Sequence, residues 1–539
     1  MNYNSHIKIC LAFLLLQGLL CFSFLFEQSV IANSSAQKGL TAQELRGKQI
    51  YLNGTASSGG EIFAYLGSDS LEVPGSTMPC VNCHGQSGKG KPEAGVNPSD
   101  LTWEALTKPY GITHQNGRKH PPYTDRALEL AIVRGLDPAG NKLLPVMPRY
   151  QMSKTDLADL IAYMKLLGEN RQRGVSEDTI TIGMIIPTQG PLASLGEAVK
   201  ATTTGFFEEV NRQGGIYNRK IVLKIVPTGD SAEATSLAAR RFIQDQEIFA
   251  LTSAFTAGAD AELAALMKEL EVPLVGPLTL QPQVGHPLNR YVFYLLSGLA
   301  DQARVLVNFA SRQSPDLKSG GLIAFPDSGS QVAVVNAIID QCRKESCGSV
   351  EKFSYKQEAF DAAALAGTLN RTNKKVVFFL GSSTEALELV KEADKLNSLP
   401  TVYFPGGVAA NNLFDAPPGF KNKLILSLPS SPADQTPQGL DEFRAMAAKY
   451  NLPRNHVASQ IMAYSAGKIL VEGMRRCGKD LSAENLITAL ERLDEYQTGL
   501  TPPVTYGPNR RLGAWGAYVV IVDLDKKGLV PAGSWIKLD

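Results

Sequence analysis

From about residue 179 onward, short apolar runs alternate with amphipathic segments. Ile180, Ile182 and Met184 alternate with small or polar residues, and the run then becomes fully apolar before a Gly/Pro-rich loop. An Ala/Thr-rich segment follows to Asn211 and stops at two glycines, the pattern of a helix with a glycine end. Similar apolar runs, each separated from the next by a helical pattern, predict strands at 220–226, 249–252, 273–276, 321–325, 375–380, 401–404, 423–427 and 517–522.

Strands that alternate with helices of this length predict right-handed βαβ units and parallel sheets. The predicted strands are too many for a single sheet, so residues 179–539 are predicted to form two α/β lobes. Segments rich in Pro, Ser or Gly near residues 298, 430 and 502 are the predicted crossovers between the lobes.

The N-terminal part of the chain follows a different pattern. Lys8 precedes an apolar run from Ile9 to Phe26, and small residues near Ala32 offer a cleavage site. This predicts a signal peptide at 1–32 and export to the periplasm. The run is nearly as long as a membrane-spanning helix, so an uncleaved anchor is the alternative. A separate domain is predicted at 42–168, followed by a charged linker at 169–178.

Composition narrows the function classes without naming one. The chain has 539 residues, enough for two to four domains. Its 53 Lys and Arg residues nearly balance 52 Asp and Glu residues, which leaves a net charge of +1. A basic footprint for nucleic acid is therefore not indicated, and we expect no nucleic-acid partner.

The run Cys80-Val81-Asn82-Cys83-His84 carries the most specific chemistry. A C-x-x-C-H run is the attachment motif of a c-type haem, in which the two thiols bind the vinyl groups and the histidine is the proximal iron ligand. A redox C-x-x-C or half of a zinc site would be the alternatives. No second pair of zinc ligands follows at suitable spacing, and the flanking sequence does not have a βαβ pattern.

Met147 is the predicted second axial ligand of the haem iron. It lies in an extended, Pro-bracketed run, about sixty residues after the cysteines, and an amphipathic helix is predicted directly behind it at 154–167. A methionine opposite a histidine gives a six-coordinate iron with a raised potential. Met78 and Met152 are competing candidates, because a single methionine often serves only as core filler.

These motifs give residues 42–168 a resemblance to class I cytochromes c. Gly47–Tyr51 resembles the first helix of that family, and the run L-A-D-L-I-A-Y-M resembles its last helix. The resemblance implies that the two helices cross, with Gly47 or Tyr51 against Tyr163. It also implies a small, all-α domain with one covalently bound haem c. A Gly/Ser-rich insert at 55–76 departs from the family pattern, and the sequence indicates no role for it.

The rest of the chain, 179–539, resembles the type I periplasmic binding proteins, in particular the branched-chain amino-acid and amide receptors of ABC importers. The segments that carry the resemblance are I-G-M-I-I-P-T-Q-G-P-L-A-S-L-G (182–196), E-V-N-R-Q-G-G-I (209–216) and V-P-L-V-G-P-L-T (272–279). Such proteins close two lobes on a small solute, which binds at the carboxyl ends of the strands. The resemblance implies solute contacts from Ser194, Thr252, Ser253, Thr256, Leu278, Thr279, Asp327 and Ser382.

Several positions depart from that family's pattern, among them an Asp327–Gln331 run without the usual tyrosine and Ser382 where an aromatic residue is often found. Leu195 stands where an aromatic residue is common, and Gly406 stands where an acid usually neutralises the ammonium group of an amino acid. A buried ammonium group without a counter-charge is costly. We therefore expect an uncharged or anionic solute, or none. Each hydroxyl has the alternative of bonding its own turn backbone.

Five cysteines remain after the signal peptide, and two of them are assigned to haem. Cys342 and Cys347 lie at the end of a predicted helix and could form a disulfide in an oxidising compartment, the alternative being two reduced thiols. Cys477 has no evident partner and is predicted to be a buried core thiol.

Three functions remain in competition. The first is an electron-transfer protein that exchanges single electrons with a periplasmic dehydrogenase or a similar partner. The second is a solute receptor for an ABC importer and its permease, with the haem as an accessory, for an amino-acid-like, amide or other small organic solute. The third, a haem peroxidase, would need an open iron position. We expect no enzyme, and we predict that His114 and His120 are surface residues rather than ligands.

Overall fold

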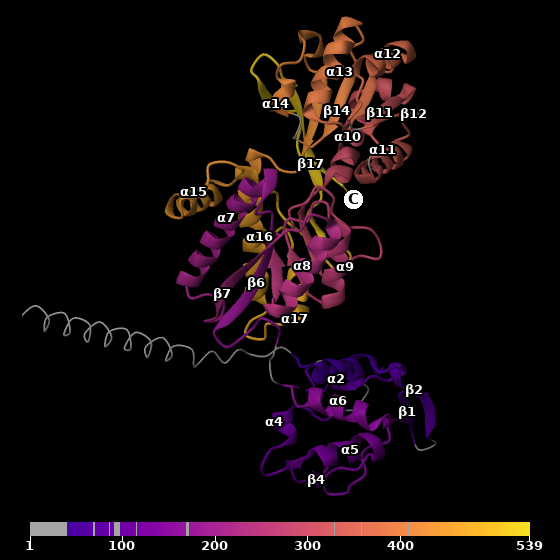
Figure 1. The fold of residues 1–539 in the computed structure, drawn as a ribbon, viewed down its shortest axis with the longest axis vertical. Coiled ribbons are helices and arrows are strands. Elements are labelled where there is room, and N and C mark those ends of the chain that lie inside the picture. Colours follow the sequence, from indigo (N-terminus) through magenta and orange to yellow (C-terminus); the bar gives the residue numbers. More distant parts are fainter. Residues whose placement is uncertain are drawn as a thin grey trace, which may run out of the picture. The chain divides into compact units, whose positions relative to one another are not determined.

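The computed structural model describes residues 40–67, 70–85, 87–90, 97–114, 116–168, 172–327, 329–356, 358–406 and 410–538 (Figure 1). The chain divides into two compact units after Arg171, within the predicted linker. The predicted signal peptide, 1–32, lies outside the described residues. Within the described ranges, no helix is long and apolar enough to cross a membrane.

The first unit has a helical frame. Its helices are α2 (Ala42–Asn53), α3 (Val81–His84), α4 (Trp103–Leu106), α5 (Asp125–Arg134) and α6 (Lys154–Met164). Thr41, Thr124 and Ser153 precede the three longer helices, and each hydroxyl accepts a hydrogen bond from a backbone N–H of the first turn. These caps explain why the helices begin where they do.

Helices α2 and α6 cross at Gly47. A side chain at this position would lie 1.9 Å from the backbone oxygen of Asp159, so only glycine allows this approach. Beside it, the rings of Tyr51 and Tyr163 are 5.5 Å apart, and Arg46 pairs with Asp159 at 2.6 Å. Both of the pairings implied by the cytochrome resemblance, Gly47 and Tyr51 against Tyr163, are therefore present at the crossing.

The insert at 55–76 forms a β-hairpin that belongs to a small antiparallel sheet. Strands β1 (Phe63–Leu66) and β2 (Leu71–Pro74) pair with each other, and β1 also pairs with β5 (Arg149–Gln151). A second pair, β3 (Ile112–Thr113) and β4 (Lys119–His120), forms a two-stranded ribbon. The cytochrome frame thus carries a sheet whose middle strand comes from the insert.

In the second unit, the first lobe is built on a parallel sheet with the strand order β16-β10-β9-β8-β6-β7. The strands are β6 (Thr179–Ile186), β7 (Lys220–Pro227), β8 (Ala250–Thr252), β9 (Leu274–Val275), β10 (Val292–Leu296) and β16 (Leu512–Ala514). The middle strands are apolar throughout because helices cover both faces of the sheet.

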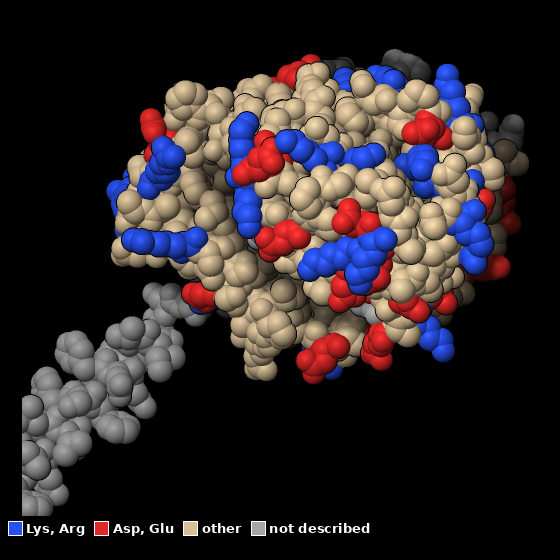
Figure 2. Space-filling view, turned by 90° about the horizontal axis from the view of Figure 1, so that it is seen from above, with Lys and Arg blue, Asp and Glu red and all other residues tan. Residues whose placement is uncertain are grey.

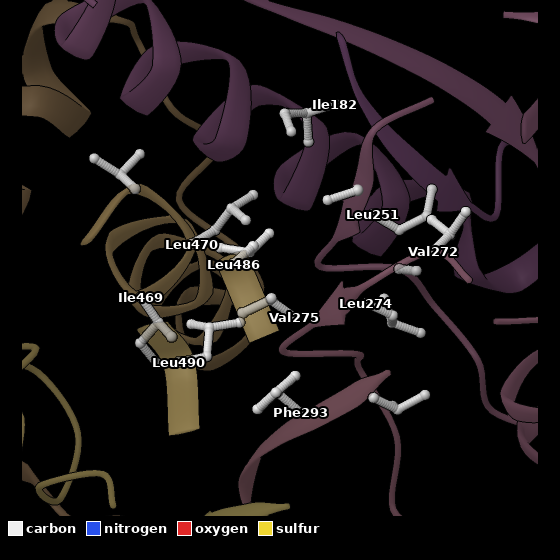
Figure 3. Packing of buried hydrophobic residues seen from close by; sticks show 14 of the residues in the cluster. Ile182, Leu251, Val272, Leu274, Val275, Phe293, Ile469, Leu470, Leu486 and Leu490 are labelled. Atoms are coloured by element: carbon white, nitrogen blue, oxygen red, sulfur yellow. The ribbon is translucent and has the colours of Figure 1, made fainter. Parts of the chain in front are cut away.

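The helices of this lobe are α7 (Ala193–Arg212), α8 (Ala232–Asp245), α9 (Asp260–Leu270), α15 (Pro437–Lys449), α16 (Val457–Arg476) and α17 (Ala483–Glu491). Helices α7 and α16 pack together on one face, and α8 packs with α9 on the other (Figure 1). Figure 3 shows part of the core, to which α16 contributes Leu470, α17 contributes Leu486, and the sheet contributes Val275 and Phe293.

The second lobe has a mixed sheet, in the order β12-β11-β13-β14-β15-β17-β18 with β19 beside β17. Its strands are β11 (Gly321–Pro326), β12 (Val350–Tyr355), β13 (Val376–Phe379), β14 (Thr401–Pro405), β15 (Leu424–Leu428), β17 (Gly516–Asp523), β18 (Gly528–Pro531) and β19 (Ile536–Lys537). The strands from β12 to β15 are parallel, whereas β17 to β19 are antiparallel additions.

Helices α10 (Leu299–Gln313), α11 (Val332–Lys344), α12 (Ala362–Thr372) and α13 (Ser383–Lys395) cover this sheet, and α14 (Ala410–Leu413) is a short helix after β14. Helices α10 and α11 pack on one face with one apolar cluster, and α12 and α13 pack on the other face with a second cluster.

The chain passes between the two lobes three times. It leaves the first lobe between β10 and α10, at residues 297–298, and returns between β15 and α15, at 429–436. The predicted third crossover near 502 is wrong. The chain stays in the first lobe through β16, which pairs with β10, and it changes lobe only at Trp515. Strand β16 has three residues, too short to give a periodic signal.

Candidate functional site

Cys80, Cys83 and His84 lie on one turn of backbone in the first unit. Cys80 has helical dihedral angles and directly precedes α3, which ends when Gly85 takes a positive φ of 71°. Residues three apart on a helix share a face, so both sulfur atoms project to the same side. Both cysteines are free thiols in the structure, and burial raises the pKa of the Cys80 thiol to about 12.

The imidazole of His84 is fixed by one ring nitrogen. Nδ1 lies 3.0 Å from the backbone oxygen of Ser99, which can only accept a hydrogen bond, so Nδ1 carries the proton. Burial lowers the pKa of His84, which favours the neutral ring. Within the described residues Nε2 has no hydrogen-bond partner, so its lone pair is available to a metal ion.

Two buried tyrosines hold the segment around the cysteines. The hydroxyl of Tyr51, in α2, donates to the backbone oxygen of Gly85 at 2.7 Å, and the hydroxyl of Tyr150, in β5, donates to that of Met78 at 2.6 Å. Burial raises the pKa of both phenols, so they stay donors over the usual pH range. The motif is therefore tied on one side to the helix crossing and on the other to the small sheet.

The three candidate methionines differ in how they are packed. Met78 and Met152 pack against the apolar core of the first unit. Met147 is partly buried but is not among the described side chains of that cluster. Its backbone N–H donates to Leu144, and its backbone oxygen accepts a hydrogen bond from Arg149. The thioether that is not used as core filler is thus the one predicted to bind iron.

The residues present fit a covalently bound haem. They provide two free thiols on one face, the Nε2 atom of His84 with its lone pair available, and the Met147 thioether, which does not pack in the described core cluster. When bound, such a group supplies reversible one-electron chemistry. In the described part of the chain, no cluster of three or more His, Cys, Asp or Glu side chains could hold a metal ion, so the zinc alternative finds no further ligands there.

His114 and His120 form a polar cluster in the β3–β4 ribbon. Their Nε2 atoms are 2.9 Å apart, Arg118 lies 2.9 Å from His114 Nε2, and Arg118 also pairs with the buried carboxylate of Asp137 at 2.6 Å. The prediction that both are surface residues is wrong for His120, which is buried against the ring of Tyr123. A Gly/Pro-rich loop gives no periodic signal for burial.

The strand order locates the edge of each lobe at which a solute is predicted to bind. Both sheets contain the same arrangement, β7-β6-β8-β9-β10 in the first lobe and β12-β11-β13-β14-β15 in the second. In such sheets the first and third strands in chain order are neighbours, here β6 with β8 and β11 with β13. The connections that follow them run in opposite directions, and a crevice opens at their carboxyl ends. The edges lie at the loops after β6 and β8 in the first lobe and after β11 and β13 in the second. Each edge contains residues predicted to contact a solute.

At the first-lobe edge, Thr252 and Ser253 are completely buried. The Thr252 hydroxyl donates to the backbone oxygen of Val275 at 3.2 Å, and the Ser253 hydroxyl donates to that of Ala463 at 3.4 Å. In this conformation both hydroxyl protons are used within the lobe. These acceptors lie on β9 and α16, so the two hydroxyls bond neighbouring elements and not their own turn backbone.

Asp260, the first residue of α9, was not identified from the sequence. Its carboxylate accepts a hydrogen bond from Thr256 at 2.7 Å and another from the Thr279 side chain, and burial raises the pKa of the carboxyl group. Two of the predicted contacts are thus directed at a protein carboxylate. Leu278 is buried, and the Ser194 hydroxyl lies 2.9 Å from His456 Nε2.

At the second-lobe edge, Ser382 caps α13 and Asp327 is exposed. Glu385 is a second residue that sequence reasoning missed. Its carboxylate accepts from the backbone N–H of Ser382 at 2.6 Å and from the Tyr355 hydroxyl at 3.3 Å. The signal for it is the S-x-x-E capping box, which directs the glutamate back to the carboxyl end of β13.

The charged side chains described at these two edges are Asp260, Asp327 and Glu385. Like charges repel at short range, so these carboxylates bear on the kind of solute, which stays a prediction. Over the described residues of the face seen in Figure 2, basic and acidic side chains are intermixed, in line with the net charge of +1.

The remaining cysteines lie in the second unit. Cys342 is in the last turn of α11, and Cys347 follows a turn in which Ser346 takes a positive φ, so that the Cys347 N–H donates to the Cys342 oxygen. Both are thiols in the structure, and burial raises the pKa of Cys342. Their pairing stays a prediction. The thiol of Cys477 donates to Gly473 and packs partly against the first-lobe core.

Comparison with known protein families agrees with this architecture. The periplasmic binding protein family model matches residues 179–528, and the cytochrome c model matches residues 76–168. The first match covers well over half of the chain, so the protein belongs to the periplasmic binding protein family, and it carries a cytochrome c domain in front. The resemblances drawn from both motif sets, and the fold classes they implied, are confirmed. The cytochrome c domain implies covalently bound haem c.

Individual relatives match the second unit. The chain is 25% identical to Leu/Ile/Val-binding protein homolog 3 of Brucella melitensis over 322 residues, covering 60% of this chain and 85% of the relative. It is 26% identical to Leu/Ile/Val-binding protein BraC3 of Rhizobium johnstonii over 343 residues, covering 61% and 87%.

Solved structures show the same fold. A branched-chain amino acid ABC transporter protein from Thermus thermophilus with bound valine aligns with a TM-score of 0.55 and 16% identity, over 68% of this chain and 98% of that one. A fatty acid ABC transporter substrate-binding protein from Thermomonospora curvata aligns at 0.54 and 14%, over 68% and 95%. At these identities the likeness establishes the fold alone.

Proposed function

We propose that the protein is a periplasmic electron-transfer protein in which one haem, attached to Cys80 and Cys83, exchanges single electrons with a partner enzyme. His84 and Met147 are the proposed axial ligands, and the second unit is the solute-binding part. The observation that carries the proposal is the arrangement at His84, where Nδ1 is held by Ser99 and Nε2 is left for the iron. A histidine fixed in this way is suited to lasting ligation.

Two axial ligands leave no open position on the iron, which favours electron transfer over reactions at the metal. The proposed partner is a periplasmic dehydrogenase that releases electrons singly. Periplasmic binding proteins and c-type cytochromes are typically periplasmic, which supports the predicted export signal. Cys80 and Cys83 would hold the haem through two thioether bonds, and the hydrogen bond of Tyr51 to Gly85 fixes the backbone directly after His84.

The test uses the full chain produced in a host that attaches haem to C-x-x-C-H motifs. We expect a mass increase of one haem, reversible one-electron reduction, and the weak red absorption band typical of Met–Fe(III) bonding. Met147→Leu should abolish this band, whereas Met152→Leu, a volume-conserving change at a core methionine, should leave it unchanged. A protein that comes out without covalent haem, or that cannot be cycled, contradicts the proposal.

The second candidate function is a receptor for an ABC importer, with a permease as its partner and the haem as an accessory. It is favoured by membership of the binding-protein family and by relatives named as Leu/Ile/Val-binding. The acidic edges at Asp260, Asp327 and Glu385 favour an uncharged or amine-bearing small organic solute. The matched folds belong to proteins named for solutes as different as valine and fatty acids, so the fold does not fix the solute.

A thermal-shift screen separates the two candidates. A receptor at a free solute concentration one hundred times its Kd gains about 2.7 kcal/mol of stability, which gives a readily measured shift. Branched-chain amino acids, their amides, the corresponding alcohols and the corresponding carboxylic acids form a matched set. If none of them moves the melting temperature of the second unit, the receptor candidate is not supported.

A further inference from the structure

The segment that carries Met147 needs support from outside itself. Residues 144–148 belong to no helix or strand, and Leu144 and Val146 are 58% and 51% exposed. Within the segment, the backbone hydrogen bond from Met147 to Leu144 closes a single turn. A lone turn of this kind is weakly ordered in water, because few buried contacts hold it. The contacts that fix it come from the two elements on either side.

Arg149 supplies the first of these contacts. One terminal nitrogen of its guanidinium donates to the backbone oxygens of Met147 and Pro148, and the other donates to that of Leu143 at 3.0 Å. The same planar group therefore joins the residue before the turn to the methionine itself. A guanidinium is suited to this because its donors project in a rigid fork, whereas an ammonium is a point charge on a flexible stem.

The C-terminal end of α5 leaves space for the Arg149 side chain. Gly135 takes a positive φ of 64° at the C-terminus of that helix, and a Cβ there would lie 1.8 Å from the Arg149 Nε. The guanidinium is partly buried, and within the described part of the chain it pairs with no carboxylate. Partial burial of a charge without a counter-ion costs free energy, and here the hydrogen bonds to backbone oxygens offset that cost.

The hairpin made by the insert braces the same place from the other side. Strand β1 pairs with β5 in a register that places Tyr65 opposite Arg149 and Ala64 opposite Tyr150. The Tyr65 hydroxyl reaches Gln151 at 2.7 Å, and Tyr150 in turn bonds Met78, two residues before Cys80. Strand β5 is thereby tied both to the hairpin and to the haem-attachment segment.

We propose that Arg149 is a positioning residue that holds Met147 against the haem iron, with β5 fixed for that purpose by the hairpin at 63–74. The inference rests on the proposed function, in which Met147 is an axial ligand. It gives the insert a role, because β5 pairs with the hairpin strand β1 in this sheet. The pairing fixes the backbone that carries Arg149 and Tyr150. Loss of the fork leaves the thioether in place in the chain but free to leave the iron.

The test compares Arg149→Gln with Arg126→Gln in the full-length, haem-loaded protein. Arg126 lies on the exposed face of α5 and pairs with Glu129, so the second variant is a matched change in the same unit. We expect Arg149→Gln to weaken the Met–Fe(III) absorption band, lower the reduction potential, and speed the replacement of Met147 by added imidazole about tenfold or more. Arg126→Gln should match the natural protein in all three measurements.

Arg149→Lys covers the case in which the glutamine variant fails to fold. Lysine keeps the charge but not the fork, so we expect faster imidazole binding than in the natural protein with the fold retained by circular dichroism. If every Arg149 variant that folds keeps the absorption band, the reduction potential and the imidazole-binding rate of the natural protein, the role of Arg149 is refuted while Met147 ligation stands. If the natural protein itself lacks the band, the axial role of Met147 falls and the inference falls with it.

Discussion

At the scale of single residues, the environment of each imidazole decides its use. His84 has one ring nitrogen fixed by a backbone oxygen and the other free, which suits a metal ligand. His114 is different, because its Nε2 faces Arg118 and His120. Burial, then these two neighbours, lower the pKa of His114, and the carboxylate of Asp137 opposes them only in part.

This environment predicts a pH dependence. Because the pKa of His114 is lower in the folded than in the unfolded chain, the unfolded chain binds more protons below about pH 6.5, and stability falls as the pH drops from there toward the folded value. We expect the urea midpoint of the first unit to fall less between pH 7.5 and pH 5.5 in His114→Asn than in the natural protein. His286→Asn, an exposed change in the other unit, is the control. Equal losses in all three proteins would contradict the assignment.

At the scale of elements, contacts between helices and strands are set by a few small or polar residues. The α2–α6 crossing depends on Gly47, which brings the helix backbones together. The β1–β5 pairing depends on an insert that a helical cytochrome pattern does not contain. In both places a local sequence feature has its effect through a partner that is distant in the chain.

The helix crossing gives a prediction in opposite directions for two glycines. Gly47→Ala places a Cβ against the Asp159 backbone and should destabilise the first unit by about 1–3 kcal/mol, as overpacking does, despite alanine's higher helix propensity. Gly367→Ala, in α12 with open space around it, should stabilise the second unit by up to about 1 kcal/mol. Chemical unfolding of the full chain measures both. A stabilised Gly47→Ala would show that the crossing can relax.

At the scale of the whole molecule, the chain consists of two units with separate cores. The first unit is small, and a haem attached to Cys80 and Cys83 would add apolar contacts that form only when this unit is folded. The second unit has two lobes whose cores are independent of haem.

Removal of the haem should therefore affect one unit only. In the double variant Cys80→Ser and Cys83→Ser, we expect the calorimetric transition of the first unit to move to lower temperature by several degrees, since about 1 kcal/mol shifts the melting temperature of a domain by roughly 2–8 °C, depending on its size. The transition of the second unit should stay in place. A shift of both transitions by the same amount would mean that the units unfold together.

The sequence determined much of this protein alone, because its signals are local. The C-x-x-C-H run, the alternation of strands and helices after residue 179, and the family segments that accompany them were sufficient for the fold class and for the haem residues as a hypothesis. Short elements such as β16 and the insert hairpin gave no usable period, which is why the third crossover was placed too early.

What only the tertiary structure decided are the partners of each polar group. It turned the Thr256 and Thr279 hydroxyls toward Asp260, brought Glu385 to the edge of the second lobe, and buried His120. It also gave Arg149 its three backbone oxygens. Pairings of this kind depend on which backbone or side chain lies next to a polar group in the folded chain. Residue type and local spacing do not specify these neighbours, because the neighbours come from other elements.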